Sequence, residues 1–488
     1  MNDFNITLRD LSKTVFIESN STYMNEIGLR AFGKVIPPEE KEQIQLDRNH
    51  MLIGFRTPQF TIDNAITIDL NFEKSYGNTV ELQSKVITIM GQKGDGKSGV
   101  SSLFIDYFIQ QRHMKIIIID PQHEYYRKEK KVFDDITNDD EYLAEIDDFL
   151  STYNQVRRGY KLYKIAPKFL GTERENIDLY YTLSWNDFKD MFTSNNLSAI
   201  NTLIELLGIE NNESNVDFLL STISENEREI FSWETLLAKL NAYRRTNKKV
   251  KRIFHALKTR MSGSQSMLSD NDEDHLNIFK ILDKYDGIIF AAELPDTESV
   301  DEEETMLTKV YNDFVKIFVM QIRNELRKTV RGSVNSRFKD KQGIVFIIDE
   351  ADVLIPNGKS SLKTILVRLA TKERKTMITL ILMTQSADKL DATIFKQSNY
   401  IITSAPDKDN AKALYLINVQ KSVVIAMQSL RKRDDSNETS IRTSVAQFSL
   451  INHDKNNAHI EFYPTLPCAD FKKTTINVNY LEQLDSNK

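Results

Sequence analysis

The sequence predicts an α/β protein built around a mostly parallel β-sheet. Three observations lead to this fold class. Residues 86–90, 116–119 and 344–348 form short apolar runs, as expected of strands that are buried on both faces. Apolar residues at helical spacing follow the first run, which gives the strand and helix alternation typical of parallel sheets. A glycine-rich motif connects that strand to that helix, where phosphate-binding loops are found.

The glycine-rich motif predicts a nucleotide site. Residues 91–98 read GQKGDGKS and match G-x-x-x-x-G-K-[ST] without a mismatch. Its glycines let the backbone approach an anion, and the following helix N-terminus supplies partial positive charge. Lys97 is expected to reach the β- and γ-phosphates of ATP, and the Ser98 hydroxyl to ligate Mg²⁺. The predicted binding set is Gly91, Gln92, Lys93, Gly94, Asp95, Gly96, Lys97, Ser98 and Gly99.

Two further strands are predicted to end in acidic residues. The run KIIIID ends at Asp120, and Glu124 follows shortly after it. Acidic residues at the carboxyl end of a parallel strand lie where open α/β sheets bind ligands, although a turn residue before proline is the simpler explanation of Asp120. The run IVFII precedes Asp349 and Glu350, which is the Walker B pattern. There the aspartate holds Mg²⁺ and the glutamate polarises the attacking water.

Two more residues are candidates for catalysis. Residues 376–383 predict another buried strand, and Gln385 follows its end. A glutamine in this place senses the γ-phosphate or orients water, or it merely terminates the strand. Arg374 lies in the turn before that strand, in the exposed position that an arginine finger needs, often toward a neighbouring subunit.

The remaining segments predict the domain boundaries. Alternating apolar residues around 51–72 indicate strands, so residues 1–80 are expected to form a small β-rich N-terminal domain. Capped helices predict that residues 136–279 form an inserted, mainly helical subdomain. The ATPase core is then assigned to 81–135 and 280–425, and a C-terminal extension to 426–488. Within these domains, further strands are expected near 160–166, 287–294, 399–403, 445–451 and 458–462. Ser184 is expected to cap the start of one helix and Ser232 the start of a helix over 233–243. Other helices are expected near 303–328, 362–370 and 409–417.

Composition limits the possible partners. The net charge of −6 argues against a chain that coats nucleic acid, although a basic pore remains compatible with it because local patches govern binding. With one cysteine, Cys468, an internal disulfide framework is excluded. No apolar run approaches 18 residues, so we expect a cytoplasmic protein with no membrane contact.

Basic residues gather in a few places. The strongest cluster is Arg244, Arg245, Lys248, Lys249, Lys251, Arg252, Lys258 and Arg260. It either contacts phosphates or forms a solvated helix face. Weaker candidates for pore contacts with DNA are Arg331, Arg337, Lys359 and Lys363.

With these motifs in this order, residues 50–420 resemble the HerA/FtsK superfamily of P-loop ATPases, and most closely the HerA-type DNA translocases. The resemblance is carried by GQKGDGKS, by DPQHEY where the family has DPHGEY, by IIDEADVLIP, and by ERKTMITLILMTQSADKLDATIFKQSNYII. Three features depart from the family pattern. The N-terminal region is short and matches the β-barrel of the family only weakly. His123 replaces a glycine, and the loop after Gln385 lacks the Arg-Pro of the family.

The resemblance implies a RecA-like core with a helical insertion, assembled as a homo-hexamer with ATP sites between subunits and double-stranded DNA in the pore. It implies that Gln385 is the sensor, that Arg374 acts on a neighbouring site, and that Asp120 and Glu124 lie near the nucleotide. We therefore predict an ATP-hydrolysing ring motor that translocates double-stranded DNA with a nuclease or other effector, in DNA processing or antiviral defence. The alternatives are an ATP-dependent scaffold that regulates an effector enzyme, and a conjugative or viral DNA-packaging ATPase.

Overall fold

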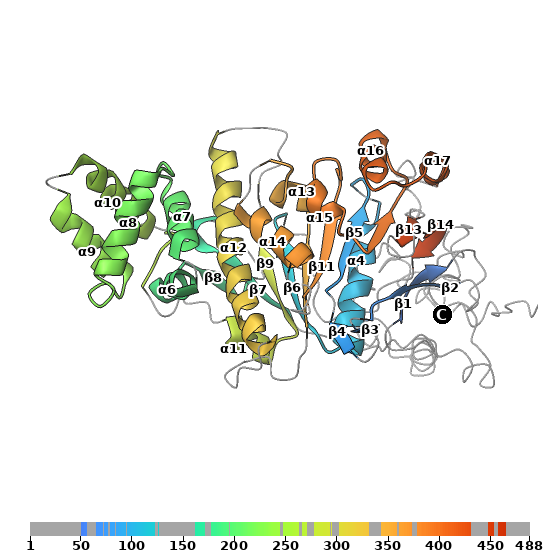
Figure 1. The fold of residues 1–488 in the computed structure, drawn as a ribbon, viewed down its shortest axis with the longest axis horizontal. Coiled ribbons are helices and arrows are strands. Elements are labelled where there is room, and N and C mark those ends of the chain that lie inside the picture. The colour runs from blue at the N-terminus through green and yellow to red at the C-terminus, as the bar shows by residue number, and fades with distance from the viewer. Residues whose placement is uncertain are drawn as a thin grey trace, which may run out of the picture.

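The fold was analysed in a computed structural model. The residues that it describes are 50–55, 65–71, 73–76, 79–82, 84–93, 95–122, 125, 162–170, 177–194, 196–244, 247–262, 266–270, 278–292, 294, 302–330, 343–358, 361–372, 378–430, 448–452 and 457–464. Figure 1 shows the sheet in the middle of the molecule, helices on both of its sides, and α8, α9 and α10 at one end.

One large β-sheet organises the fold, with strand order β2-β1-β14-β13-β12-β5-β11-β10-β6-β9-β7-β8. The strands from β12 to β8 in this order are parallel. The other four, at the opposite edge, pair antiparallel. The strands are β1 (His50–Phe55), β2 (Ala65–Asp69), β5 (Val86–Met90), β6 (Lys115–Asp120), β7 (Leu162–Pro167), β8 (Leu179–Tyr181), β9 (Gly287–Ala291), β10 (Ile344–Ile348), β11 (Ile378–Thr384), β12 (Tyr400–Thr403), β13 (Phe448–Asn452) and β14 (Asn457–Pro464).

Helices cover this sheet and form the inserted segment. They are α4 (Lys97–Asp106), α6 (Trp185–Ser194), α7 (Asn196–Leu207), α8 (Glu213–Glu225), α9 (Trp233–Tyr243), α10 (Lys248–Met261), α11 (Ile278–Lys284), α12 (Glu302–Val330), α13 (Ala351–Leu354), α14 (Ser361–Lys372), α15 (Ala392–Phe395), α16 (Lys408–Leu416) and α17 (Lys421–Gln428). A separate hairpin pairs β3 (Glu73–Tyr76) with β4 (Thr79–Leu82). No helix in the described ranges is both long and apolar enough to cross a bilayer.

The central strands are mainly apolar because both of their faces are covered. In β10, Phe346 belongs to the hydrophobic cluster under α12 and α14, while Val345 and Ile347 belong to the cluster under α4. All five residues of β10 are buried, and each such side chain contributes about 1.5–3 kcal/mol relative to exposure. The result is a helix–sheet–helix sandwich, and the predicted α/β class with a mostly parallel sheet is confirmed.

The segment between β6 and β9 supplies both helices and strands. The predicted strand near 160–166 is β7, and the predicted cap residues Ser184 and Ser232 begin α6 and α9. The sequence analysis missed β8, a strand of three residues whose short LYY run shows no periodicity. The long α12 packs against α14, α6 and α7, and so joins the helical segment to the sheet.

The described N-terminal and C-terminal strands lie together. β1 pairs with both β2 and β14, and β14 continues through β13 to β12. In Figure 1 these four strands lie at the end of the molecule opposite α8 to α10. The two segments that the sequence assigned to separate terminal domains thus contribute to one sheet, while the domain boundaries themselves stay predictions.

Candidate nucleotide-binding site

Sheet topology brings the predicted motifs to one edge. In the order β5-β11-β10-β6 the strands are parallel neighbours, so their carboxyl ends lie side by side. The phosphate-binding loop follows β5, Gln385 follows β11, Asp349 and Glu350 follow β10, and Asp120 ends β6. These four motifs therefore lie next to one another along the carboxyl edge of the parallel strands.

Two glycines in the phosphate-binding loop are required by its geometry. Gly96 caps α4 with a φ of 90°, in the left-handed region that favours glycine. Gly91 is needed for space, since a Cβ there would lie 2.6 Å from the Ser404 Oγ. Ser404 follows β12, the strand next to β5 on its other side.

Two charged residues of this loop, Lys97 and Asp95, are held by local hydrogen bonds. Lys97 is buried, and its Nζ donates to the carbonyl oxygens of Gly91 at 2.8 Å and Gln92 at 3.0 Å. The Asp95 carboxylate accepts from the Gln92 N–H at 2.8 Å and from the Ser404 hydroxyl at 2.5 Å. The loop is therefore closed on itself and tied to β12. Gly94 lies outside the described residues.

The two acidic residues after β10 are buried at the sheet edge. Asp349 is 3% exposed and Glu350 6% exposed. The Glu350 N–H donates to Asp349 Oδ1 at 2.9 Å. Glu350 has a φ of 46° and ψ of 49°, a left-handed conformation that is uncommon for a residue with a side chain. Such outliers concentrate at functional sites, which supports the prediction that this carboxylate is catalytic.

Gln385 contacts Glu350 directly. The Gln385 Nε2 donates to Glu350 Oε1 at 2.5 Å. Asn410, in the first turn of α16, holds the segment after β11, since its Nδ2 donates to the Gln385 carbonyl and its Oδ1 accepts from the Ala387 N–H. The predicted sensor and the predicted base thus form one connected pair. Sequence analysis did not find Asn410, because a lone asparagine in a helix carries no signal.

Asp120 has a clear structural partner. It is fully buried, and its Oδ2 accepts from the Tyr125 N–H at 2.7 Å. The Tyr125 hydroxyl lies 2.5 Å from Ser101 Oγ on α4. Through Tyr125, Asp120 therefore ties the segment after β6 to α4, the helix that follows the phosphate-binding loop. Asp349 lies close to the end of β6 as well, because its N–H donates to the Ile119 carbonyl. Glu124 and Arg374 lie outside the described residues.

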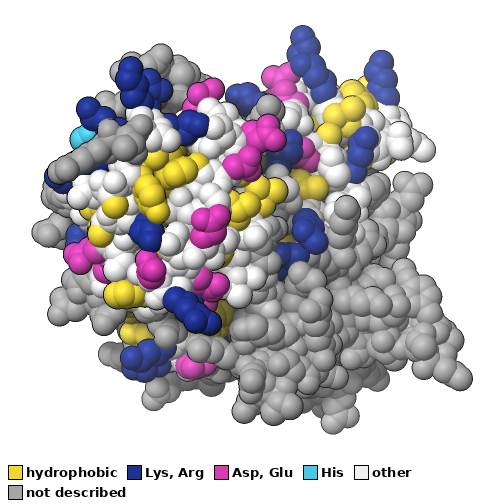
Figure 2. Space-filling view, turned by 60° about the vertical axis from the view of Figure 1, so that its left-hand side comes forward, with side chains coloured by type: hydrophobic (Ala, Val, Ile, Leu, Met, Phe, Trp, Pro, Cys, Tyr) yellow, Lys and Arg dark blue, Asp and Glu magenta, His cyan; other side chains and the backbone are white. Residues whose placement is uncertain are grey.

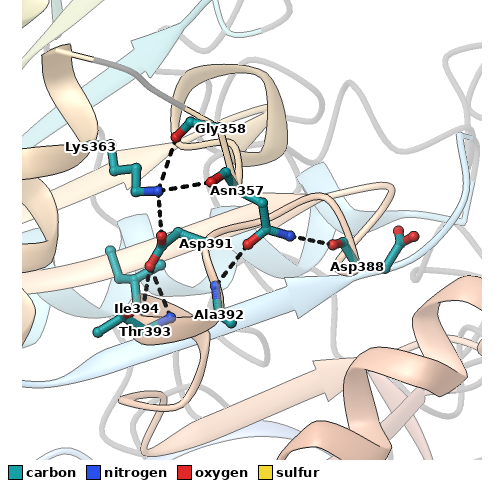
Figure 3. Close-up of polar contacts among 8 residues, drawn as sticks. All are labelled: Asn357, Gly358, Lys363, Asp388, Asp391, Ala392, Thr393 and Ile394. Atoms are coloured by element: carbon teal, nitrogen blue, oxygen red, sulfur yellow. Dashed lines mark hydrogen bonds and ion pairs between the residues drawn. The ribbon is translucent and has the colours of Figure 1, made fainter.

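A polar clasp joins the segments that follow Glu350 and Gln385. We define the clasp as Asn357, Gly358, Lys363, Asp388 and Asp391. Lys363 Nζ lies 2.6 Å from Asp391 Oδ2 and donates to the carbonyls of Asn357 and Gly358. The Asn357 side chain donates to the Asp388 carbonyl and accepts from the Ala392 N–H. Figure 3 shows Lys363 and Asn357 pointing between the two segments.

The clasp gives Lys363 a structural explanation. Its amino group is engaged by three oxygen atoms, so holding the clasp accounts for this lysine without DNA. The other weak pore candidates, Arg331, Arg337 and Lys359, lie outside the described residues. Sequence analysis missed Asn357 and Asp391 because their partners are distant in the chain.

Two carboxylates near the site have shifted pKa values. Burial raises the pKa of Asp352, despite the hydrogen bond that its Oδ1 accepts from the Thr384 hydroxyl at 2.6 Å. For Asp391 burial acts in the same direction, but the hydrogen bond and charge of Lys363 and the N–H groups of α15 outweigh it. They hold the Asp391 pKa below its usual value. The clasp therefore contains an ionised carboxylate at neutral pH.

The residues at this edge fit a nucleotide with Mg²⁺. Mg²⁺ in phosphate sites is bound by one or two carboxylates or hydroxyls together with the phosphates. Ser98, in the first turn of α4, and Asp349, directly after β10, lie at the same edge of the sheet and are the candidates to supply these groups. Among the described residues, no group of three or more His, Cys, Asp or Glu side chains forms a ready metal site.

The chain is similar to several solved structures, and the similarity to the first of them supports the fold. VirB4 of Thermoanaerobacter pseudethanolicus aligns with a TM-score of 0.51 and 15% identity, over 80% of this chain and 93% of that one. The bacterial conjugative coupling protein TrwBdeltaN70 aligns with a TM-score of 0.45 and 11% identity, over 88% of this chain and 91% of that one. The genome packaging NTPase B204 from Sulfolobus turreted icosahedral virus 2 aligns with a TM-score of 0.31 and 10% identity, over 78% of this chain and 98% of that one. No curated protein sequence matches the chain.

Family comparisons cover the motifs. The family described as ATPase family associated with various cellular activities matches residues 303–404, which include Glu350 and Gln385. The family described as Helicase HerA, central domain, matches residues 78–332, which include the phosphate-binding loop and amount to more than half of the chain. The chain therefore belongs to the HerA central-domain family, within the HerA/FtsK superfamily of P-loop ATPases.

Proposed function

We propose that this protein is an ATP-hydrolysing ring motor that translocates double-stranded DNA and works with a nuclease or another effector. One observation carries the proposal, the hydrogen bond between Gln385 and Glu350 beside the phosphate-binding loop. It links a group suited to sensing the γ-phosphate to a group suited to activating water. A sheet edge with only a structural role would not need this pair, nor the left-handed backbone of Glu350.

The proposed chemistry needs positioning and charge, without a covalent intermediate. Lys97 now donates to two loop carbonyls, and the β- and γ-phosphates would offer stronger, anionic acceptors to the same amino group. Glu350 would orient the attacking water and accept its proton. Gln385 keeps the Glu350 carboxylate in place, and burial of that carboxylate strengthens each electrostatic contact.

Further residues are proposed to complete the site. Ser98 and Asp349 would hold Mg²⁺, which neutralises charge on the phosphates when it is bound. Arg374 is proposed to act on the site of a neighbouring subunit in a homo-hexamer, and Asp120 and Glu124 to lie near the nucleotide. The Asp120 hydrogen bond to Tyr125 supports a role in shaping the wall of this site.

Family membership supports DNA as the substrate of the motor. The sequence-independent phosphate contacts of a pore would make DNA binding sensitive to salt. The effector partner rests on the resemblance to HerA-type translocases alone. The clasp supports a proposed coupling of hydrolysis to movement, because it joins the segments that follow Glu350 and Gln385. A change at either side chain would then be passed to both segments.

The test is steady-state ATP hydrolysis with and without linear duplex DNA at two salt concentrations. Native protein should be stimulated by DNA, with less stimulation at higher salt, and Lys97→Ala and Glu350→Gln should both lose hydrolysis. Hydrolysis that is lost in both variants but indifferent to DNA would reject the motor and leave an ATP-dependent scaffold. Hydrolysis that persists in both variants would reject the site itself.

A further inference from the structure

We propose that the exposed face of α10 is a second binding surface for duplex DNA, remote from the nucleotide site. This inference rests on the proposed function, because it takes duplex DNA as the ligand. We define the basic face as Lys248, Lys251, Arg252, His255 and Lys258. Figure 1 places α10 at the end of the molecule, far from α4 and the phosphate-binding loop.

The structure separates the basic cluster of the sequence into two groups. One group makes contacts within the protein. Lys249 Nζ donates to the Ser214 hydroxyl, and Arg260 Nε donates to the Leu206 carbonyl at 3.0 Å. The Arg244 guanidinium lies 4.5 Å from the centre of the Phe254 ring. These three cations are explained by packing, and Arg245 lies outside the described residues.

The other group faces solvent. All five residues of the basic face are exposed, and their spacing of three or four residues places them on one side of the helix. The opposite side is buried through Val250, Ile253, Phe254 and Leu257. Within the described part of the chain, the four Lys and Arg side chains of the basic face have no carboxylate within ion-pair distance. An ordinary solvated face mixes charges of both signs, so this one is unusual in a chain with a net charge of −6.

The chemistry of the face favours a phosphate backbone over a protein partner. Protein interfaces are depleted in lysine and have apolar or aromatic anchors at their centre. The exposed positions of α10 are the basic face and Thr259, and none of them is apolar. Figure 2 shows Lys and Arg side chains gathered with a histidine at the upper left of the view, on the end of the molecule that is turned forward.

The length of the helix also suits a duplex. The 14 residues of α10 extend about 21 Å. Along such a length duplex DNA carries roughly 12 phosphate charges. The cations are spaced by about one helical turn, or ~5 Å, so several of them can reach phosphates at once. Such contacts position DNA without reading its sequence.

The test compares two triple variants of the full-length chain. Lys251→Gln/Arg252→Gln/Lys258→Gln removes three cations from the basic face. Lys189→Gln/Arg228→Gln/Lys284→Gln removes three exposed cations from elsewhere in the same region, with the same change in net charge. Binding of a fluorescent linear duplex is measured by anisotropy over a series of salt concentrations, alongside DNA-independent ATP hydrolysis and the melting temperature.

The basic-face variant should bind duplex at least tenfold more weakly at low salt. The slope of log affinity against log salt should fall by about 2.7, or 0.9 for each lost phosphate contact. Its basal ATP hydrolysis and melting temperature should match those of the native protein, and the control variant should bind almost normally. Native affinity and slope in the basic-face variant, or an equal loss in the control, would overturn the inference while leaving the motor intact. No duplex binding by the native protein would reject both proposals.

Discussion

The contact between the phosphate-binding loop and β12 leads to a sharp prediction for Gly91→Ala. The added Cβ would lie 2.6 Å from Ser404 Oγ, and 3.1 Å and 3.3 Å from two atoms of Asp95. Ser404 is 1% exposed, so its hydroxyl has no route into solvent. The serine must rotate away and give up its hydrogen bond to the Asp95 carboxylate, or the loop must open.

Either response has a similar magnitude. A hydrogen bond to a charged group contributes about 1.5–3 kcal/mol, and a loop that opens to avoid the clash must be closed again when nucleotide binds. A cost of about 2 kcal/mol corresponds to roughly 30-fold weaker binding. We therefore expect Gly91→Ala to bind a non-hydrolysable ATP analogue about 30-fold more weakly than the native protein.

A double-mutant cycle isolates the clash. Ser404→Ala alone loses the same hydrogen bond to Asp95 without adding a methyl group to the loop. It should weaken binding about tenfold, for a cost of about 1.5 kcal/mol at the lower end of that range. Because the double variant Gly91→Ala/Ser404→Ala has no oxygen in the path of the new methyl group, it should bind almost as well as Ser404→Ala. Titration calorimetry of the four proteins gives the coupling free energy. Native affinity of Gly91→Ala for the analogue would refute the reasoning. So would a double variant whose fold loss in affinity equals the product of the fold losses of the two single variants.

Two further predictions follow from the site and the clasp. Gln385→Ala removes the hydrogen bond to the buried Glu350 carboxylate. The kcat for ATP hydrolysis should therefore fall by about 10- to 100-fold, at about 1.4 kcal/mol per tenfold, with unchanged nucleotide affinity. A kcat within twofold of the native value would argue against a catalytic role for this hydrogen bond. Asp391→Asn removes an ionised carboxylate whose pKa is lowered by Lys363, and should reduce the free energy of unfolding by about 1 kcal/mol at neutral pH. The lowered pKa stabilises the fold only while the Asp391 carboxylate is ionised. The difference in the free energy of unfolding between the native protein and Asp391→Asn should therefore be constant above the pKa of the unfolded state and shrink as pH falls through the pKa of the folded state. Denaturant unfolding at several pH values measures this difference, and a difference that stayed constant in acid would contradict the prediction.

The motifs explain how much of the site could be predicted from the sequence. The phosphate-binding loop needs glycines, a lysine and a serine at fixed spacing, and all lie within one short segment. The strands β5, β10 and β11 are recognisable because burial on both faces favours nearly continuous apolar runs, in which the only polar residues are Thr88, Thr379 and Thr384. Parallel pairing then places Gln385 and Glu350 at the same edge.

Other parts of the site depend on contacts that no local pattern encodes. Ser404 limits space at Gly91 only because β12 pairs with β5. Asn410 braces Gln385 only because α16 begins beside the end of β11. The partner of Lys363 is Asp391, which lies on a different segment. Each is a single polar residue of a common type.

The sequence by itself determined the fold class, the family and the chemical groups of the candidate site, because these depend on local spacing and on the hydrophobic pattern of buried strands. Tertiary structure alone decided how these groups interact. It brought Gln385 to the Glu350 carboxylate, placed β1 and β2 at the edge of the main sheet, and divided the basic cluster into packed and exposed cations. The physical reason is that hydrogen bonds, steric limits and exposure depend on neighbours far away in the chain, which strand order and helix packing select.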